Sequence, residues 1–508
     1  MEQSTIAAIA TPPGTGGVGI IKISGPDAIK ATAQIFCPGP VPKQSKPFPV
    51  NDPSFFSPWK IHYGHIADST QNRVYDEVIV AVMPGPRSYT REDVVEIQAH
   101  GGTVILEGIM SLLMRHGICV AQPGEFTRRA FLNGRIDLAQ AEAVIDLINA
   151  RCDAAVDLAL DQAAGSLSGA IETVRSRLTR ILAAIEAMVD FPDAVEGEVD
   201  TAALCRDIAI EALDPISSMI DAYEGGKTLR EGFRVVIAGA PNVGKSSIMN
   251  RLAGTDRAIV TEHPGTTRDY IETPLPTGGI PITLVDTAGL RTDPEPVEAI
   301  GIDMARRHIH EANLVLHVLD ASAAVSVEDQ AFFEEIHHKA ALVVLNKIDR
   351  VNKNRGTTAA ETLNGRPVGD KSVAASAPAP APPGPGGQAL PVDLRVVLPE
   401  SMARATVVAT SAKYNIGLDA LRTHIVDMAQ RGYTHTPEKP VPNFRHKALL
   451  LEARDALSLA IDNLKQETDP ELVSIDLRQA YDRLGEITGR TAAPDVLDDI
   501  FSRYCIGK

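Results

Sequence analysis

This chain of 508 residues is poor in aromatic residues and in cysteine, and it has no long apolar run. Its apolar stretches fall well short of the roughly 18 residues needed to cross a bilayer, so we predict that this is not a membrane protein. The cysteines lie far apart in the sequence: Cys37, Cys119, Cys152, Cys205 and Cys505. Because they form no Cys-x-x-Cys pair and have no nearby Cys or His at metal-ligand spacing, neither a disulfide framework nor a structural zinc site is expected.

Basic residues are also scarce relative to acidic ones. The chain has 49 Lys and Arg against 65 Asp and Glu, which gives a net charge of -16. This charge disfavours non-specific binding to polyanions, so a nucleic-acid partner would need a local basic patch. The first residues, Met-Glu-Gln-Ser-Thr, carry an acid where a targeting peptide carries basic residues, and we predict a cytoplasmic location.

Changes in periodicity along the chain predict about three domains. Residues 1–122 alternate short apolar strands with one helix-length segment, which is typical of a compact α+β domain. Residues 123–230 and 435–508 carry helical apolar stripes, one of them spaced i, i+3, i+4 and i+7 from Leu178. Residues 231–434 alternate β-branched runs with helices, which predicts a mostly parallel sheet. The simplest architecture inserts this α/β domain into a helical bundle built from both flanks.

Two segments of biased composition are not expected to bind a ligand. Residues 372–391 contain six Pro, six Ala and three Gly, and we predict a flexible surface insertion at about 354–400. Gly14, Gly16 and Gly19 spell the dinucleotide fingerprint Gly-x-Gly-x-x-Gly. They run into a β-like stretch rather than a helix, so a pyrophosphate would find no helix N-terminus there and we reject that function.

The motif that carries chemistry lies at 239–246, which reads Gly-Ala-Pro-Asn-Val-Gly-Lys-Ser and matches Gly-x-x-x-x-Gly-Lys-Ser/Thr. It follows a predicted strand at 235–238 and precedes a helix predicted to start at Ser247, as a phosphate-binding loop requires. The backbone N–H groups of such a loop cradle the phosphates. Lys245 would reach the β and γ phosphates, and Ser246 would offer its hydroxyl to Mg²⁺.

Three more motifs follow predicted strands in the order typical of GTP-binding proteins. Asp-Thr-Ala-Gly at 286–289 places a carboxylate near Mg²⁺ and a glycine N–H near the γ-phosphate. In Asn-Lys-Ile-Asp at 346–349, Asp349 can accept the adjacent N–H and amine of guanine, a pair of donors that adenine lacks. Ser-Ala-Lys at 411–413 would contact the base through its backbone. The four motifs resemble the translation-factor branch of GTP-binding proteins.

The residue that would direct the attacking water is not fixed by these motifs. Leu290 follows the Asp-Thr-Ala-Gly motif and cannot orient a water as a glutamine does. Glu298 is a candidate in the same segment, although the sequence alone favours a solvated surface glutamate there. Asn242 could ligate a monovalent cation near the phosphates through its amide oxygen. Such a cation would act as an arginine finger does.

Several features together point to one family. They are the phosphate-binding loop, Pro-Gly-Thr-Thr-Arg-Asp at 264–269, Asp-Thr-Ala-Gly-Leu-Arg at 286–291, the helical flanks and the final Cys-Ile-Gly-Lys at 505–508. The final tetrapeptide is the most distinctive, because it has no role in a generic GTP-binding fold. From Thr5 to Lys508 the chain resembles the MnmE (TrmE) family of tRNA uridine modification GTPases, and the insertion at about 354–400 is the main departure.

The resemblance implies a three-part fold. An N-terminal α+β domain binds tetrahydrofolate and forms a homodimer, two chain segments build a helical bundle domain, and a P-loop GTPase domain is inserted between them. With the flavoprotein MnmG (GidA) in a heterotetramer, such an enzyme adds an aminomethyl or carboxymethylaminomethyl group to the 5-position of the wobble uridine of tRNA. The one-carbon donor would be 5-formyltetrahydrofolate or a related tetrahydrofolate. GTP hydrolysis would depend on K⁺ and be coupled to dimerisation of the G domains.

The resemblance also implies which residues bind the nucleotide and its ions. The GTP contacts are Asn242, Val243, Gly244, Lys245, Ser246, Ser247, Thr261, Glu262, His263, Pro264, Gly265, Thr266, Thr267, Asp286, Thr287, Ala288, Gly289, Asn346, Lys347, Asp349, Ser411 and Ala412. The ion ligands are Ser246 and Thr267 for Mg²⁺, and Asn242, Thr261, His263 and Thr266 for K⁺. Glu298 matches the family's glutamate that assists the attacking water, which reverses the expectation from sequence alone.

The implied folate contacts are Lys22, Glu96, Arg135 and Lys508. Where the family has Arg, this chain has Lys22, and where the family has Lys, this chain has Arg135. Both exchanges keep the positive charge but not the bidentate geometry. The resemblance implies that the tail, with Cys505, lies near the folate, where this thiol could have a chemical role, although a cysteine near a chain end is usually inert. Two interpretations are open for the basic cluster of Arg128, Arg129 and Arg135: contact with tRNA or folate, or a solvated helix end. The solvated helix end is favoured for Arg128 and Arg129.

Two alternative functions share the nucleotide motifs. A ribosome-assembly GTPase would need an RNA-binding module with a basic face, and neither a KH-type Gly-x-x-Gly clamp nor a basic tail follows the predicted G domain. A non-catalytic, nucleotide-gated scaffold would explain Leu290. Glu298 and Asn242 argue against that scaffold.

Overall fold

The computed structural model of this protein describes residues 4–40, 48–190, 200–254, 272–275, 279–286, 307–336, 338–351, 405–431, 440–466 and 468–507. The chain divides into two compact units. Unit 1 comprises Met1–Gly226 and Thr436–Lys508, and unit 2 comprises Lys227–His435. The insertion predicted at about 354–400 lies outside the described residues.

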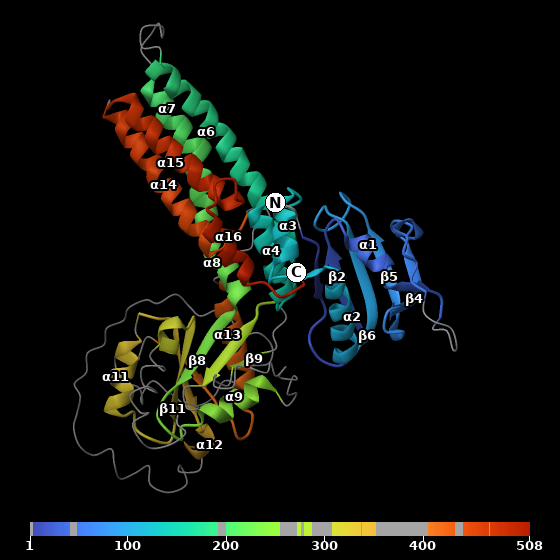
Figure 1. The fold of residues 1–508 in the computed structure, drawn as a ribbon. Helices are drawn as coiled ribbons and strands as arrows, with labels where there is room; N and C mark the ends of the chain where they lie inside the picture. Colours follow the sequence, from blue (N-terminus) through green and yellow to red (C-terminus); the bar gives the residue numbers. More distant parts are fainter. Residues whose placement is uncertain are drawn as a thin grey trace, which may run out of the picture. The chain divides into compact units, whose positions relative to one another are not determined.

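Unit 1 begins with a seven-stranded sheet in the order β3-β4-β5-β6-β2-β1-β7 (Figure 1). The strands are β1 Ile6–Ile9, β2 Gly16–Ser24, β3 Phe36–Pro38, β4 Ile61–Asp68, β5 Arg73–Met83, β6 Val94–Gly101 and β7 Cys119–Val120. All neighbouring strands are antiparallel except β1 and β7. Helices α1 (Ala28–Ala33) and α2 (Thr103–Arg115) share one apolar core with the sheet, because alternate strand residues such as Ile21 and Ile23 face it.

The glycines of the rejected dinucleotide fingerprint have structural roles in this sheet. Gly16 and Gly19 lie within β2, so no helix follows them directly. A Cβ on Gly19 would lie 2.6 Å from a methyl carbon of Leu106, and a Cβ on Gly101 would lie 2.5 Å from the carbonyl oxygen of Gly16. Gly19 therefore allows the close approach of β2 to α2, and Gly101, outside the fingerprint, allows that of β6 to β2.

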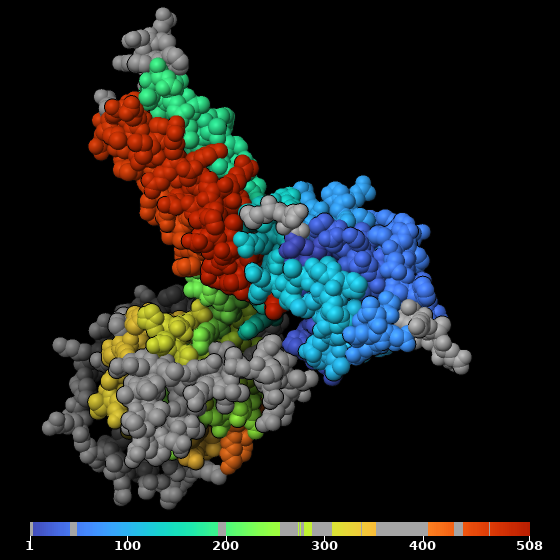
Figure 2. Space-filling model, in the orientation of Figure 1, coloured from blue at the N-terminus to red at the C-terminus, as the bar shows by residue number. Residues whose placement is uncertain are grey.

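The helical part of unit 1 is built from both flanks of unit 2. Its helices are α3 Glu125–Leu132, α4 Leu138–Asn149, α5 Asp153–Ala163, α6 Ser166–Asp190, α7 Thr201–Ile208, a π-helix at Ala209–Leu213, α8 Asp214–Glu231, α14 Phe444–Lys465, α15 Pro470–Thr488 and α16 Pro494–Ser502. The stripe predicted from Leu178 is buried against residues of α14 and α15 such as Leu457 and Leu477. Figure 2 shows the surfaces of the two flanks side by side in green and red. The predicted bundle of two chain segments is confirmed.

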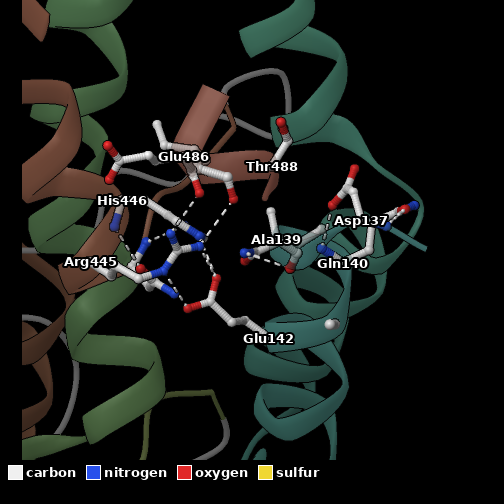
Figure 3. Close-up of polar contacts among 12 residues, drawn as sticks. Asp137, Ala139, Gln140, Glu142, Arg445, His446, Glu486 and Thr488 are labelled. Atoms are coloured by element: carbon white, nitrogen blue, oxygen red, sulfur yellow. Dashed lines mark hydrogen bonds and ion pairs between the residues drawn. The ribbon is translucent and has the colours of Figure 1, made fainter. Parts of the chain in front are cut away.

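A polar cluster of Glu142, Arg445 and the fully buried His446, here called the Glu142 cluster, joins the flanks (Figure 3). Glu142 of α4 accepts hydrogen bonds from Arg445 Nε at 2.9 Å and Nη2 at 2.7 Å, and its Oε2 lies 2.6 Å from His446 Nε2. Arg445 also donates to the carbonyl oxygens of Glu486 and Ile487, 3.0 Å each, at the end of α15. One arginine thus satisfies helix-end carbonyls and a carboxylate together.

Unit 2 holds a six-stranded sheet in the order β13-β12-β11-β8-β10-β9. The strands are β8 Phe233–Ala238, β9 Glu272–Leu275, β10 Ile282–Asp286, β11 Leu314–Asp320, β12 Ala341–Asn346 and β13 Thr406–Ala409. The helices with defined bounds are α9 Lys245–Ala253, α11 Val327–Glu335, α12 Ile348–Val351 and α13 Leu418–Arg431. Every strand pair is parallel except β10 and β9. The predicted mostly parallel sheet is confirmed.

Strand β9 is absent from the sequence-based prediction. It is four residues long and contains Pro274, and a proline argues against a strand. It lies at the edge of the sheet, where a missing backbone donor is tolerated. Among the described residues, no helix is both long and apolar enough to cross a membrane.

Candidate nucleotide site and N-terminal cation cluster

The loop between β8 and α9 has a backbone that only glycine allows at two positions. Gly239 has a φ of 141°, and a Cβ there would lie 2.3 Å from the carbonyl oxygen of Val318 in β11. Gly244 has a φ of 103° and caps α9, and a Cβ there would lie 2.3 Å from Asn346 Nδ2. The motif glycines therefore let the loop wrap closely around the N-terminus of α9.

Lys245 and Ser246 open α9 and face the ends of neighbouring segments. The buried Lys245 ammonium donates to the carbonyl oxygens of Gly239 and Ala240, 2.8 Å each, so it lies inside the loop. The Ser246 hydroxyl donates to Asp286 Oδ2 at 2.7 Å, at the end of β10. Hydroxyl and carboxylate oxygens are the donors that Mg²⁺ prefers, and here two of them are within contact of each other.

The guanine motif is tied to the phosphate-binding loop. Asn346, 2% exposed, donates from Nδ2 to the carbonyl oxygen of Val243 at 2.8 Å. Its Oδ1 accepts from the backbone N–H of Ala412 at 3.1 Å and lies 3.3 Å from the Thr410 hydroxyl. Ser411 Oγ donates to Asp349 Oδ1 at 2.6 Å, which orients the carboxylate predicted to read guanine. The structure thus brings three separate predicted motifs together.

Lys347 has a partner, Asp320, that the sequence analysis missed. Its φ is 63°, and its ammonium donates to the carbonyl oxygen of Asn242 at 2.6 Å and to Asp320 Oδ2 at 2.7 Å. Burial would raise the pKa of Asp320, but hydrogen bonds from Lys347 and Ser322 outweigh burial and lower it. Asp320 is the last residue of β11, and its position at the carboxyl end of a parallel strand is the signal that could have identified it.

A second group of predicted residues meets around Tyr89 in unit 1. Lys22 Nζ lies 3.9 Å from Glu96 Oε1 and 5.3 Å from the centre of the Tyr89 ring. Arg135 Cζ lies 4.6 Å from the same ring centre, and its Nη1 donates to the Tyr89 carbonyl oxygen at 2.9 Å. Lys22 Nζ also lies 5.7 Å from the ring centre of Phe126, which is fully buried. Three of the four predicted folate contacts therefore converge, together with two aromatic residues that the sequence analysis did not single out.

The C-terminal tail packs onto this part of unit 1. The Tyr504 hydroxyl donates to the carbonyl oxygen of Ala141 at 2.5 Å. A Cβ on Gly507 would lie 2.8 Å from Ala10 Cα, so the tail closely approaches the end of β1. In β1, Ala8 pairs with Lys22 of β2. Cys505 is exposed.

Comparison with known proteins covers the whole chain. The family model "GTP-binding protein TrmE N-terminus" matches residues 5–135, and "MnmE helical domain" matches residues 138–505. The curated protein "tRNA modification GTPase MnmE" of Natranaerobius thermophilus is 39% identical over 509 residues, covering 100% of each chain. The protein of the same name from Bacillus subtilis is 38% identical over 507 residues, again covering 100% of each.

The chain belongs to the MnmE family. The predicted family, fold class and enzyme class, a GTPase, are confirmed. Among solved structures, the G domain of the T. maritima FeoB iron transporter matches 39% of this chain and 99% of that chain at 24% identity, with a TM-score of 0.25. That score is too low to carry an argument, so the MnmE assignment rests on the full-length relatives.

Several residues predicted from the MnmE resemblance lie outside the described residues. They are Thr261, Glu262, His263, Pro264, Gly265, Thr266, Thr267, Thr287, Ala288, Gly289, Glu298 and Lys508. Their assignments to GTP, K⁺, Mg²⁺, the attacking water and folate stay predictions. Of the predicted nucleotide contacts, Asn242, Val243, Gly244, Lys245, Ser246, Ser247, Asp286, Asn346, Lys347, Asp349, Ser411 and Ala412 are described.

One expectation about the basic cluster is wrong. Arg129 is buried rather than solvated, with ion pairs to Glu92 at 3.2 Å and to Glu125 at 2.8 Å. Glu92 comes from the β5–β6 loop and is a long-range partner that the local run of charges does not reveal, whereas Glu125 lies one turn earlier on the same helix. Arg128 pairs with Asp498 at 3.0 Å on the surface.

Proposed function

We propose that this protein is a GTP-hydrolysing component of tRNA wobble-uridine modification. It would add an aminomethyl or carboxymethylaminomethyl group to the uridine 5-position with a one-carbon unit from a tetrahydrofolate. The observation that carries the proposal is full-length identity of 38–40% to curated relatives named "tRNA modification GTPase MnmE". The hydrogen bonds that Lys245, Ser246, Asn346 and Asp349 each form with other motif residues support the nucleotide part, because they hold these groups together as nucleotide binding requires.

Two cations belong to the proposed hydrolysis. The Ser246 hydroxyl and the Asp286 carboxylate fit Mg²⁺, and Thr267 is the further proposed ligand. Asn242 is exposed in the phosphate-binding loop, with a φ of 63°, and its amide oxygen suits a monovalent cation. K⁺ bound by Asn242, Thr261, His263 and Thr266 would supply positive charge to the phosphates as hydrolysis proceeds. Glu298 would orient the attacking water.

The cluster around Tyr89 supports a folate site. Lys22 and Arg135 supply positive charge, Glu96 supplies an acceptor, and Tyr89 and Phe126 supply aromatic surface. A tetrahydrofolate combines a flat heterocycle with carboxylates, so this set of groups matches its chemistry. The position of Gly507 against the end of β1 supports a contribution from Lys508, the next residue.

The proposed assembly contains a second copy of the chain, a flavoprotein and tRNA. A homodimer through the N-terminal domain is supported by exposed apolar residues on neighbouring strands, since Tyr63 of β4 pairs with Ile79 of β5 and both are exposed, as is Ile61. G domains would dimerise during GTP hydrolysis. The flavoprotein MnmG (GidA) would complete a heterotetramer that acts on tRNA in the cytoplasm.

The deciding experiment measures GTP turnover by the full chain in matched KCl and NaCl buffers, together with Glu298→Ala. We expect turnover to rise at least tenfold in KCl and to fall at least tenfold in the variant, on the scale of one lost electrostatic or water-positioning contact, roughly 10² to 10³ in favourable cases. Equal rates in both salts would contradict the K⁺ site. An unchanged rate in Glu298→Ala would contradict the role of Glu298.

A second assay tests the tRNA reaction itself. The protein, an MnmG-type flavoprotein, tRNA and 5-formyltetrahydrofolate-derived donor are combined, and the wobble uridine is analysed by mass spectrometry of nucleosides. Modified uridine that requires all components supports the proposal. GTP turnover without any modification, combined with binding to ribosomal RNA, would instead favour the alternative of a ribosome-assembly GTPase.

A further inference from the structure

The ring of Tyr89 is the common contact of two cations that come from distant parts of the chain. Lys22 lies on β2 and Arg135 follows α3, 113 positions later by their numbers, 135 minus 22. Their charged groups lie 5.3 Å and 4.6 Å from the centre of this one ring. Both distances are within the roughly 6 Å at which a cation is attracted to an aromatic face.

Tyr89 is held firmly in this position. Its hydroxyl oxygen lies 2.9 Å from Thr127 Oγ1, and Thr127 is fully buried. Its carbonyl oxygen accepts the hydrogen bond from Arg135, and the next carbonyl, of Thr90, accepts from Asn133 Nδ2 at 2.6 Å. Burial raises the pKa of Tyr89, so the phenol is neutral at physiological pH. The ring is therefore a rigid, uncharged platform on a fixed loop.

An aromatic ring can hold two cations close together although they repel each other. Two cations that must meet the same ligand repel each other, and their long side chains lose rotamer freedom when they are fixed. An aromatic face attracts both charges without neutralising either of them, whereas a carboxylate between them would compete with an anionic ligand. Glu96 pairs with Lys22 at the long distance of 3.9 Å. The ring therefore positions both cations without adding a second carboxylate beside them.

We propose that Tyr89 is the positioning residue of this site, holding Lys22 and Arg135 as a fixed cation pair for the anionic groups of a folate-type ligand. The inference rests on the proposed folate function. The ring, rather than the hydroxyl, does the positioning, because both cations lie near the ring centre while the hydroxyl is bound to Thr127.

The test measures binding of 5-formyltetrahydrofolate to the full chain by isothermal titration calorimetry. Tyr89→Leu should weaken binding about tenfold, since it removes both cation–π contacts. Tyr89→Phe keeps the ring and should bind within about threefold of the unchanged protein, the scale of one lost neutral hydrogen bond. Tyr89→Met is a second non-aromatic variant of similar length in case Tyr89→Leu fails to fold. Tyr75→Leu is the matched control, because Tyr75 contacts Arg73 in the same way at 4.7 Å elsewhere in the sheet.

A double-mutant cycle separates positioning from general support of the fold. If Tyr89 acts through Arg135, then Tyr89→Leu should cost much less affinity in an Arg135→Ala background than alone. Additive losses would overturn the proposal, as would Tyr89→Leu or Tyr89→Met with unchanged affinity, or Tyr89→Phe as weak as Tyr89→Leu. If the unchanged protein binds no folate while GTP turnover is intact, the proposed folate function fails and takes the role of Tyr89 with it.

Discussion

The Glu142 cluster and the nucleotide site use charged side chains in opposite ways. In the Glu142 cluster a carboxylate that is 11% exposed has both oxygens occupied by Arg445 and His446. In the nucleotide site, Lys347 and Asp320 are 22% and 17% exposed, close to the 21% of Arg445, but Ser246 and Asp286 share a hydrogen bond that a metal can replace. The two regions therefore differ in their partners rather than in their exposure. Charges whose partners all lie within the fold join two segments of the chain, whereas charges with exchangeable partners can serve a ligand.

The largest expected effect comes from removing the centre of the Glu142 cluster. Glu142→Ala leaves the Arg445 guanidinium and His446 without their carboxylate, and breaking such a buried pair costs about 3–5 kcal/mol of unfolding free energy. The measurement is urea denaturation followed by circular dichroism. Glu224→Gln is the control, because Glu224 binds Lys447 at an exposed position and should cost about 1 kcal/mol or less. GTP affinity should be unchanged in both variants.

The Glu142 cluster also predicts how the stability difference between the unchanged protein and Glu142→Ala depends on pH. Burial would raise the pKa of Glu142, but His446 and Arg445 outweigh burial and lower it well below the ordinary value. A carboxyl with a lowered folded-state pKa stabilises the fold fully above its unfolded pKa of about 4.3, and this contribution is lost as the pH falls through the folded value. The stability gap between the unchanged protein and Glu142→Ala should therefore narrow below about pH 4. A gap that stays constant down to pH 3 would contradict a charged Glu142 as its source.

A smaller effect, on nucleotide affinity, is expected from replacing Asp349, the carboxylate predicted to bind guanine. Asp349→Asn replaces an acceptor of two guanine donors by an amide that offers a donor, so GDP should bind about tenfold to a hundredfold more weakly, on the scale of a charged hydrogen bond. Xanthosine diphosphate has an oxygen in place of the guanine amine and should gain affinity. Fluorescent nucleotide titration measures both. Asp419→Asn, at an exposed position of α13, is the control, and equal losses for both nucleotides would refute base reading by Asp349.

The sequence predicted those parts of both regions that depend on local pattern. Apolar spacing located the long helices, and the motif at 239–246 located the phosphate-binding loop, because a loop that wraps phosphates needs glycine where φ is positive. Strand β9 was missed because Pro274 hides an edge strand.

The contacts that sequence reasoning missed join residues far apart in the chain. Glu142 and His446 meet across 304 positions, and nothing in either local pattern indicates the other. Tyr89 and Asp320 lie in a loop and at a strand end, where identity alone does not distinguish a ligand contact from a surface residue. The family resemblance supplied Lys22 and Arg135, but only the fold brings them to one ring.

The smallest expected effect comes from replacing Asp320. It tests whether this carboxylate serves nucleotide binding rather than the stability of the fold. Asp320→Ala removes the partner of Lys347 but leaves its bond to the Asn242 carbonyl, so GDP affinity should fall only about fivefold, in line with roughly 1 kcal/mol for a partly exposed pair. The KM for GTP should rise while kcat stays unchanged, because Asp320 acts through Lys347 on binding. Glu328→Gln, exposed on α11, is the control. A stability loss as large as that of Glu142→Ala would place Asp320 with the structural charges instead and remove the contrast between the two regions.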